Sequence, residues 1–209
     1  MANMEGKIIV VVGAPSSGKS TLIRNLKNHY KIEVFLEGEE KDFPHYIKEN
    51  IKHNKNGLQT MLFFHNLSVF QYIKAMRLKN KGKIVLLDNF WFSNIFYLDI
   101  ILKNKNSRVL VKNLVEWTNK ILPLPDIIIY LETTKRLIKN RINARKRIFE
   151  KDFLDQADKI NKNHITYFKN PTIFHKDFPE SILMKFDANK LNFHSVAAKL
   201  SLEKKKNAK

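Results

Sequence analysis

The stretch Lys7-Ile-Ile-Val-Val-Val-Gly13-Ala-Pro-Ser-Ser-Gly18-Lys19-Ser20 joins an uninterrupted apolar run to a glycine-rich segment. The run Ile8–Val12 has no polar alternation, which predicts a strand buried on both faces of a parallel sheet. The glycine-rich segment fits G-x-x-x-x-G-K-[ST] at every fixed position, and a helix is expected to begin near Ser20. Inward-turned backbone N–H groups and the helix N-terminus form a nest for phosphates. The sequence therefore predicts a nucleoside triphosphate site, ATP with Mg²⁺, made of Gly13, Ala14, Pro15, Ser16, Ser17, Gly18, Lys19, Ser20 and Thr21.

Short apolar runs alternate with stretches of helical period along the rest of the chain. We expect strands at Lys7–Val12, Lys31–Phe35, Lys83–Leu87, Ile127–Leu131 and Ile182–Phe186. We expect helices at Ser20–His29, Thr60–Lys79, Ser93–Lys103, Val109–Ile121 and from Thr134 to Arg145 and beyond. This alternation predicts an α/β fold, a doubly wound five-stranded parallel sheet like that of P-loop nucleoside triphosphate hydrolases. One domain is expected over residues 1–203, followed by a solvated basic tail at 204–209.

Composition excludes several classes of protein. The 209 residues contain no cysteine, which rules out disulfides, thiolate metal sites and thiol catalysis. No run of 18 apolar residues and no apolar leader occurs, so we expect a cytoplasmic protein with no membrane partner. The net charge is +18, but the lysines are spread along the chain among many Asn, Ile and Phe residues. We interpret this as compositional bias with a general attraction for anions, and do not expect nucleic acid as a partner.

Carboxylates follow two of the expected strands at the edge where ligands of open α/β sheets bind. Glu37 lies just past the second strand, where it can accept a proton from a substrate hydroxyl. Asp88 ends the third strand, where with Ser20 it can hold Mg²⁺. The alternatives are a solvated acidic loop for Glu37 and a capping or turn residue for Asp88.

An arginine-rich segment follows the fourth strand. Arg141 and Arg145 are four residues apart and share a helix face. Arg147 converges with them only if the helix ends near Arg145 and the chain turns over the site. Such a lid places guanidinium groups on the phosphoryl group in transfer. An exposed basic helix is the alternative.

The order of these segments resembles the deoxynucleoside kinase family and its sister group, the thymidylate kinases. The resemblance implies that Glu37 is the general base for a 5′-hydroxyl and that Asp88 belongs to the Mg²⁺ environment. It also implies an arginine lid that extends to Glu150, in which Arg141, Arg145 and Arg147 have catalytic roles. Lys19, in the phosphate-binding loop, has a catalytic role as well. Asp187, Ala188 and Asn189 resemble the loop that lies over adenine. A homodimer is usual in this family.

Two departures bear on the substrate. Asn89 stands where both groups usually have Arg after the third-strand acid, and Leu36 stands where thymidylate kinases usually have Arg before the second-strand Glu. We therefore favour a kinase that phosphorylates the 5′-hydroxyl of a deoxynucleoside. A thymidylate kinase remains open, since Phe149-Glu150 resembles that group's lid. A catalytically weakened ATP-binding protein that binds nucleic acid or another partner, and a kinase of another small molecule, remain open as well.

The expected base pocket lies on the helix Thr60–Lys79. The resemblance puts His65 where deoxynucleoside kinases have a base-pairing Gln, with Asn66 and the aromatic Phe64 beside it. Phe90 is a candidate for stacking on the base. The expected substrate site therefore consists of Glu37, Phe64, His65, Asn66, Asn89, Phe90 and Glu150. A satisfied, partly buried histidine and ordinary core aromatics are the alternatives.

Overall fold

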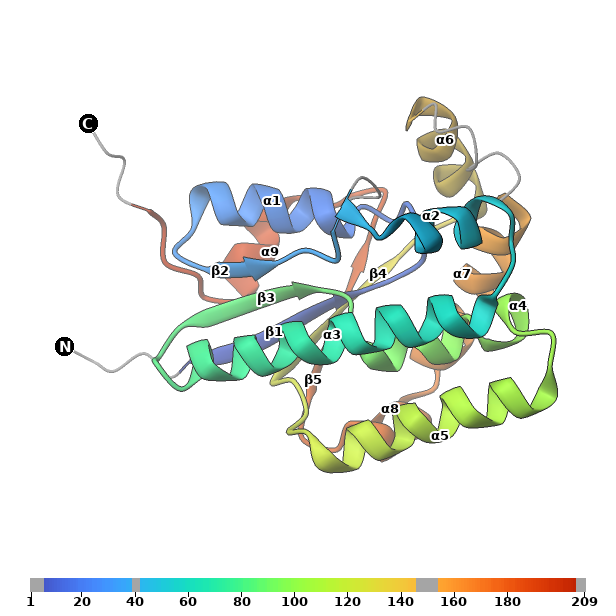
Figure 1. Cartoon of the computed structure of the whole chain (residues 1–209). Coiled ribbons are helices and arrows are strands. Elements are labelled where there is room, and N and C mark those ends of the chain that lie inside the picture. Colours follow the sequence, from blue (N-terminus) through green and yellow to red (C-terminus); the bar gives the residue numbers. More distant parts are fainter. Residues whose placement is uncertain (1–5, 39–41, 146–153, 206–209) are drawn as a thin grey trace.

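The chain was analysed in a computed structural model that describes residues 6–38, 42–145 and 154–205. Five strands form one parallel sheet in the order β2-β3-β1-β4-β5, which confirms the predicted doubly wound sheet (Figure 1). The strands are β1 (Lys7–Val12), β2 (Glu33–Phe35), β3 (Ile84–Asp88), β4 (Ile127–Glu132) and β5 (Ile182–Asp187). The continuous apolar runs predicted the three central strands because those strands are covered on both faces.

The register brings the ends of the strands that carry the predicted carboxylates to one edge of the sheet. Val11 at the end of β1 pairs with Asp88 at the end of β3. Phe35, the last residue of β2, pairs with Leu87 of β3. The loop after β1, Glu37 and Asp88 therefore gather at the carboxyl edge, the edge at which open α/β sheets bind ligands.

Alternate side chains of the strands enter two separate cores. On one face, Ile9, Val11 and Leu86 pack against α1 (Lys19–His29) and α9 (Phe193–Lys199). On the other face, Val10 and Leu87 pack among a larger set of helices. These are α3 (Gly57–Lys79), a 3₁₀ helix (Trp91–Phe96), α5 (Lys105–Ile121), α7 (Leu154–Lys169) and α8 (Pro171–Asp177). Figure 1 shows α1 and α9 on one side of the sheet and α3 and α5 on the other.

Three shorter or peripheral helices complete the described fold: α2 (His45–Lys52), α4 (Leu98–Ile101) and α6 (Lys135–Arg145). The sequence analysis did not predict α2, whose buried residues Ile47 and Asn50 lie three apart on one helix face. Within the part of the chain that the structure describes, no helix is both long and apolar enough to cross a membrane.

The predicted helix Ser93–Lys103 is wrong in detail. The chain winds instead as the 3₁₀ helix Trp91–Phe96 and then as α4, with an i to i−3 bond from the Tyr97 amide to the Asn94 carbonyl at the junction. The tighter winding sends Trp91, Phe92 and Phe96 into the core and leaves Asn94 and Tyr97 at a cavity. Spacing alone does not distinguish this arrangement from an α-helix.

Lys204 and Lys205, the first two residues of the predicted basic tail, are exposed to solvent but bonded to the rest of the chain. The Lys31 amide donates to the Glu203 carbonyl and the Lys205 amide donates to the His29 carbonyl, each at 2.9 Å. Lys204 forms an antiparallel bridge with Tyr30. The tail is therefore attached to the segment between α1 and β2 at least as far as Lys205.

A carboxylate joins three elements at the amino edge of the sheet. Asp126, which precedes β4, accepts the Ile8 amide of β1 at 2.7 Å and the Lys79 ammonium of α3 at 2.7 and 2.8 Å. The hydrogen bond from the Ile8 amide to Asp126 takes the place of one to water at the end of β1. The ion pair between Asp126 and Lys79 links α3 to the same carboxylate.

We expect Asp126→Ala to lower the free energy of unfolding by about 2 kcal/mol, because a backbone donor and an ammonium lose their shared acceptor. Urea unfolding followed by circular dichroism measures this change. The control is Asp99→Ala, which removes an exposed ion pair with Arg108 and should cost less than about 0.5 kcal/mol. Equal losses in the two variants would contradict the account.

Candidate active site

The glycine-rich loop has the geometry that a phosphate nest requires. Gly18 has φ 101°, in the left-handed region that favours glycine, and a Cβ there would lie 2.9 Å from the Arg141 guanidinium. α1 begins directly after it, at Lys19, with no acidic side chain in its first turn. The Lys19 ammonium donates to the carbonyls of Gly13 at 3.0 Å and Ala14 at 3.2 Å, which holds it over the loop. The loop thus presents amides, a helix N-terminus and a cation to the same space.

Ser20 and Asp88 form an all-oxygen pair next to the loop. The Ser20 hydroxyl donates to Asp88 Oδ2 at 2.5 Å, and the second carboxylate oxygen of Asp88 is buried with no partner among the described residues. Hard oxygen donors suit Mg²⁺, which keeps several waters and binds through one or two carboxylates plus phosphates. No group of three or more His, Cys, Asp or Glu side chains gathers anywhere in the described residues. The pair therefore fits a Mg²⁺ ion that takes its remaining ligands from triphosphate and water.

Glu37 has the electrostatic setting of a general base. Withdrawal from water raises the pKa of its carboxyl to about 7, and the nearby charge of Asp88 acts in the same direction. Lys19 and a hydrogen bond from the Asn89 side chain lower the pKa and keep it from rising further. A carboxyl with a pKa near neutrality is matched to accepting a proton at working pH.

Asn89, whose side chain hydrogen-bonds to Glu37, has an unusual backbone conformation. Its φ is 75°, in the left-handed region, where Asn is several times commoner than most residues. The backbone amide of Asn89 donates to the Val11 carbonyl at 3.0 Å, which fixes the turn after β3. The residue that replaces the family Arg thus contacts the carboxylate expected to act as the base.

Arg141 ties α6 to the loop and to the chain after β5. Its guanidinium donates to the carbonyls of Ser16 at 3.2 Å, of Ser17, and of Ala188 at 3.1 Å. Arg141 and Ala188 also border a cavity of about 440 Å³, together with Gly18, Asn189 and Phe193. The structure therefore brings Arg141, Ala188 and Asn189 together beside the loop, as the predicted adenine site requires. Asp187 is exposed and does not border this cavity; its carboxylate accepts from the Asn189 backbone amide, and this bond lowers its pKa.

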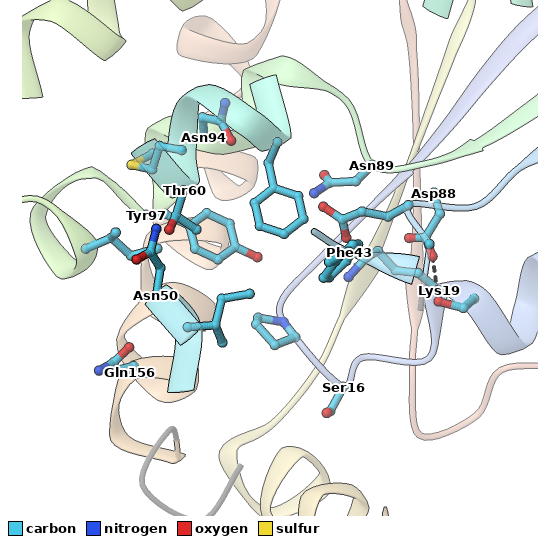
Figure 2. Close-up of a pocket in the computed structure, with 18 of the residues that line it drawn as sticks. Ser16, Lys19, Phe43, Asn50, Thr60, Asp88, Asn89, Asn94, Tyr97 and Gln156 are labelled. Carbon is cyan, nitrogen blue, oxygen red and sulfur yellow. Dashed lines mark hydrogen bonds between the residues drawn. The ribbon is translucent and has the colours of Figure 1, made fainter. Parts of the chain in front are cut away.

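A larger cavity of about 750 Å³ opens in front of the loop (Figure 2). Lys19, Ser20, Glu37, Asp88 and Asn89 border it at the sheet edge. Its far end is formed by α2, α3 and the segment after β3. The residues there are Asn50, Thr60, Met61, Phe64, Asn94, Tyr97 and Ile101, with Gln156 from α7. One end is thus charged and phosphate-binding, and the other combines the apolar side chains of Met61, Phe64 and Ile101 with several polar groups.

The structure places three expected substrate residues outside this cavity. His65 is 2% exposed and hydrogen-bonds to Thr118 of α5, so it is the buried, satisfied histidine that the sequence left as an alternative. Asn66 is exposed on α3 and does not border the cavity. Phe90 is buried against Trp91, Phe92 and Phe178. Counting residues from a motif does not fix which face of a helix meets the site.

Phe64 does border the cavity, in edge contact with Phe43 at a ring separation of 5.2 Å. Asn94, Tyr97, Thr60 and Asn50 were missed by the sequence analysis. Asn94 and Tyr97 follow Asp88 by six and nine residues, and both border the cavity. Arg147 and Glu150 lie outside the described residues, and the side chain of Arg145, at the end of α6, does as well.

Fold and site together define a P-loop phosphotransferase. A family model for deoxynucleoside kinases matches residues 9–204. Structures of a deoxyadenosine kinase from M. mycoides cover 93% of this chain. The structure with products dCMP and a flexible dCDP has a TM-score of 0.73 at 18% identity over 98% of that chain. The structure with dATP has a TM-score of 0.70 at 19% identity over 99% of that chain.

A probable thymidylate kinase from Archaeoglobus fulgidus is 24% identical over 161 residues, which is 74% of this chain and 79% of the relative. The family match extends over most of the sequence, and the chain belongs to the deoxynucleoside kinase family. It is therefore an ATP-dependent phosphotransferase that acts on nucleosides. The predicted family and enzyme class are confirmed.

We expect Arg141→Ala to raise the KM for ATP by about tenfold or more, because a charged hydrogen-bonding group leaves the cavity beside the loop. The initial rate of ADP release at varied ATP measures the change. Arg136→Ala, an exposed position at the start of the same helix, is the matched control and should leave the KM within about twofold. A similar rise in the KM for ATP in both variants would show that the loss of any arginine on α6 has this effect, and would contradict a specific role of Arg141 in ATP binding.

Proposed function

We propose that this kinase transfers the γ-phosphoryl group of ATP to the 5′-hydroxyl of a deoxynucleoside, with Glu37 as the general base. The observation that carries the proposal is the position of Glu37. Its carboxyl borders the cavity between the phosphate loop and the far end formed by α2, α3 and the segment after β3, and its pKa lies at about 7. A nucleoside with its base at the far end places its 5′-oxygen at this carboxylate and near the triphosphate.

In this proposal, one set of residues binds ATP and another set acts on the hydroxyl of the nucleoside. The loop amides and Lys19 hold the triphosphate, and Arg141 with the Ala188–Asn189 loop contacts the nucleotide beyond it. Ser20 and Asp88 would hold Mg²⁺, which when bound neutralises charge on the phosphate oxygens. Glu37 accepts the proton of the hydroxyl as its oxygen bonds to the γ-phosphorus and the bond from that phosphorus to ADP breaks. Arg145 and Arg147 remain proposed contributors to a lid over the same phosphoryl group.

A thymidylate kinase is less well supported by the site. Such an enzyme must hold the phosphate of its acceptor, and the residue before Glu37 is the apolar Leu36. Its side chain packs with the α1-side core, and its carbonyl accepts from Gln71 at 2.8 Å. The Glu37 loop therefore offers no guanidinium to an acceptor phosphate. Asn89 likewise supplies an amide where a cation would be needed.

The proposed base predicts a pH dependence. Because the carboxylate form accepts the proton, activity should fall as pH drops through the pKa of Glu37 and the group becomes protonated. We expect the rising limb of kcat/KM for the nucleoside at pH about 7 or somewhat lower, since Mg²⁺ beside Asp88 offsets the negative charge that raises this pKa. Initial rates over pH 5 to about 9 at saturating ATP measure it. A flat profile below pH about 7 would contradict the assignment.

We expect Glu37→Gln to reduce kcat by about 10²–10⁴-fold while leaving ATP binding unchanged within about threefold, because the amide keeps the shape but accepts no proton. Single-turnover phosphorylation and calorimetric titration with ATP measure the two quantities. Glu33→Gln, an exposed change at the start of β2, is the control and should retain activity. A Glu37→Gln enzyme that keeps its rate would exclude Glu37 as the base.

A further inference from the structure

We propose that Gln71 positions Glu37 for catalysis through a hydrogen bond to the backbone directly before it. The Gln71 side-chain amide donates from α3 to the Leu36 carbonyl at 2.8 Å. Neither Gln71 nor Leu36 borders the cavity to which Glu37 belongs. Gln71 is therefore a positioning residue, which acts on the reaction through Glu37 and does not touch the substrate. The inference rests on the proposed role of Glu37 as the general base and adds a residue on which that role depends.

Glu37 lies beyond the part of β2 that the sheet holds in place. β2 is an edge strand, joined to the sheet through β3 alone. Its last paired residue is Phe35, which pairs with Leu87. Glu37 comes two residues later, so the ladder between β2 and β3 does not fix its position. A general base must lie within hydrogen-bond reach of the proton that it removes, and a misplacement of about 1 Å can cost about 10²-fold in rate. The segment after Phe35 therefore needs another support.

The bond from Gln71 supplies this support because of where it falls on the backbone. The peptide group between Leu36 and Glu37 is planar, and its plane contains both the Leu36 carbonyl oxygen and the Glu37 Cα. A hydrogen bond to that oxygen limits the rotation of the plane, and with it the direction in which the Glu37 side chain leaves the backbone. The Leu36 side chain packs with the core on the α1 side of the sheet. Residue 36 is thus held from both faces, by its side chain on one and by Gln71 of α3 on the other.

Gly38 sets the backbone on the other side of Glu37. Its φ is 105°, in the left-handed region that favours glycine. A Cβ at Gly38 would lie 3.2 Å from the Phe43 ring, so the chain turns close to an aromatic side chain. Glu37 therefore stands between a hydrogen-bonded peptide group and a tight turn. Of these two restraints, the bond from Gln71 can be removed by a side-chain substitution that leaves the backbone unaltered.

α3 holds the Gln71 amide in a fixed place relative to the sheet. Tyr72, the next residue, is fully buried in the core beneath the helix. Val69 of α3 and Phe35 of β2 pack against that same core. The packing between the helix and the end of β2 therefore keeps the amide opposite the Leu36 carbonyl.

Gln71→Met tests the bond, because methionine has a similar length and no N–H group. We expect the single-turnover rate to fall by about tenfold, since the base is less often in place. The Kd values of ATP and of the nucleoside should stay within about threefold, because Gln71 does not border the cavity. Rapid-quench turnovers and calorimetric titrations measure these quantities with whichever of the four common deoxynucleosides the unmodified enzyme phosphorylates fastest. An unchanged rate, or a loss confined to nucleoside affinity, would overturn the proposal.

Ser68→Ala is the matched control. Ser68 lies three residues before Gln71 on the same face of α3. Its hydroxyl donates within the helix, to the Phe64 carbonyl at 2.7 Å. The variant removes a hydrogen-bonding group from the helix and none from the segment before Glu37, so the rate should stay within about twofold of the parent. Equal losses in Ser68→Ala and Gln71→Met would show a general disturbance of α3 and would contradict a specific role of Gln71.

A cycle of variants distinguishes the positioning of the base from a general structural role. In Glu37→Gln protein the base is already lost, so a second change that acts only through the base has nothing left to lower. We expect Gln71→Met to slow the Glu37→Gln enzyme by less than about twofold. A further loss of about tenfold in the double variant would show that Gln71 acts independently of Glu37, and the proposal would fail.

Gln71→Lys restores a donor at the same position, since its ammonium can reach the Leu36 carbonyl. We expect its single-turnover rate to lie within about threefold of the parent. A lysine variant as slow as Gln71→Met would mean that the hydrogen bond is not what matters at residue 71. Gln71 is half-buried, and we expect each variant to melt within a few degrees of the parent. If Gln71→Met does not fold, Gln71→Leu, which also lacks the donor, takes its place in every comparison.

The outcomes separate this inference from the proposed function. A Glu37→Gln enzyme that keeps its rate would overturn both, since no base would remain to be positioned. A slow Glu37→Gln enzyme beside a Gln71→Met enzyme at the parent rate would overturn the role of Gln71 alone. The predicted result is a loss in each single variant and no further loss in the double variant.

Discussion

The site depends on the electrostatic balance among Glu37, Asp88 and Lys19 at the carboxyl edge of the sheet. Burial and the charge of Asp88 raise the pKa of Glu37, and the Lys19 ammonium offsets part of this rise. Asp88 is held by the Ser20 hydroxyl, and Lys19 is held by two carbonyls of the loop. The strand register brings these groups together. A shift of β2 or β3 by one residue would point a carboxyl to the opposite face and break the balance.

Asn89, the residue after Asp88, stands at the same edge of the sheet where the family usually has Arg. Asn89 takes a left-handed backbone conformation that suits Asn and places its amide against the Glu37 carboxyl. This bond favours the charged form of Glu37. Where the family usually has the cation of an Arg, this chain thus has a neutral amide that donates to Glu37, the proposed general base. Because both deoxynucleoside kinases and thymidylate kinases usually have Arg at this position, the replacement alone does not decide between a nucleoside and a monophosphate acceptor.

Much of the fold and the charged half of the site could be predicted from the sequence. Continuous apolar runs mark strands that are buried on both faces, and the loop motif fixes where the first of them meets a helix. The carboxyl ends of parallel strands share one edge, so Glu37 and Asp88 could be expected near the loop without knowledge of side-chain contacts. A homodimer and a cytoplasmic location stay predictions.

The other half of the cavity could not be predicted, because it depends on which face of a helix meets the substrate. His65 and Phe90 were expected in the base pocket and lie in the core. Asn94 and Tyr97 border the cavity, and the chain that carries them winds as a 3₁₀ helix followed by α4, where the sequence predicted one helix. That winding is decided by the packing of Trp91, Phe92 and Phe96, which is a tertiary effect.

The central claim is that this edge transfers a phosphoryl group to a nucleoside hydroxyl. The most direct measurement supplies ATP labelled at the γ-phosphate and Mg²⁺, with the four deoxynucleosides and dTMP tested one at a time. Lys19→Ala protein serves as the blank for contaminating kinases. The account predicts labelled deoxynucleoside 5′-monophosphate that is absent with Lys19→Ala, and little or no labelled diphosphate from dTMP. Labelled dTDP with no labelled monophosphate from any nucleoside would contradict it.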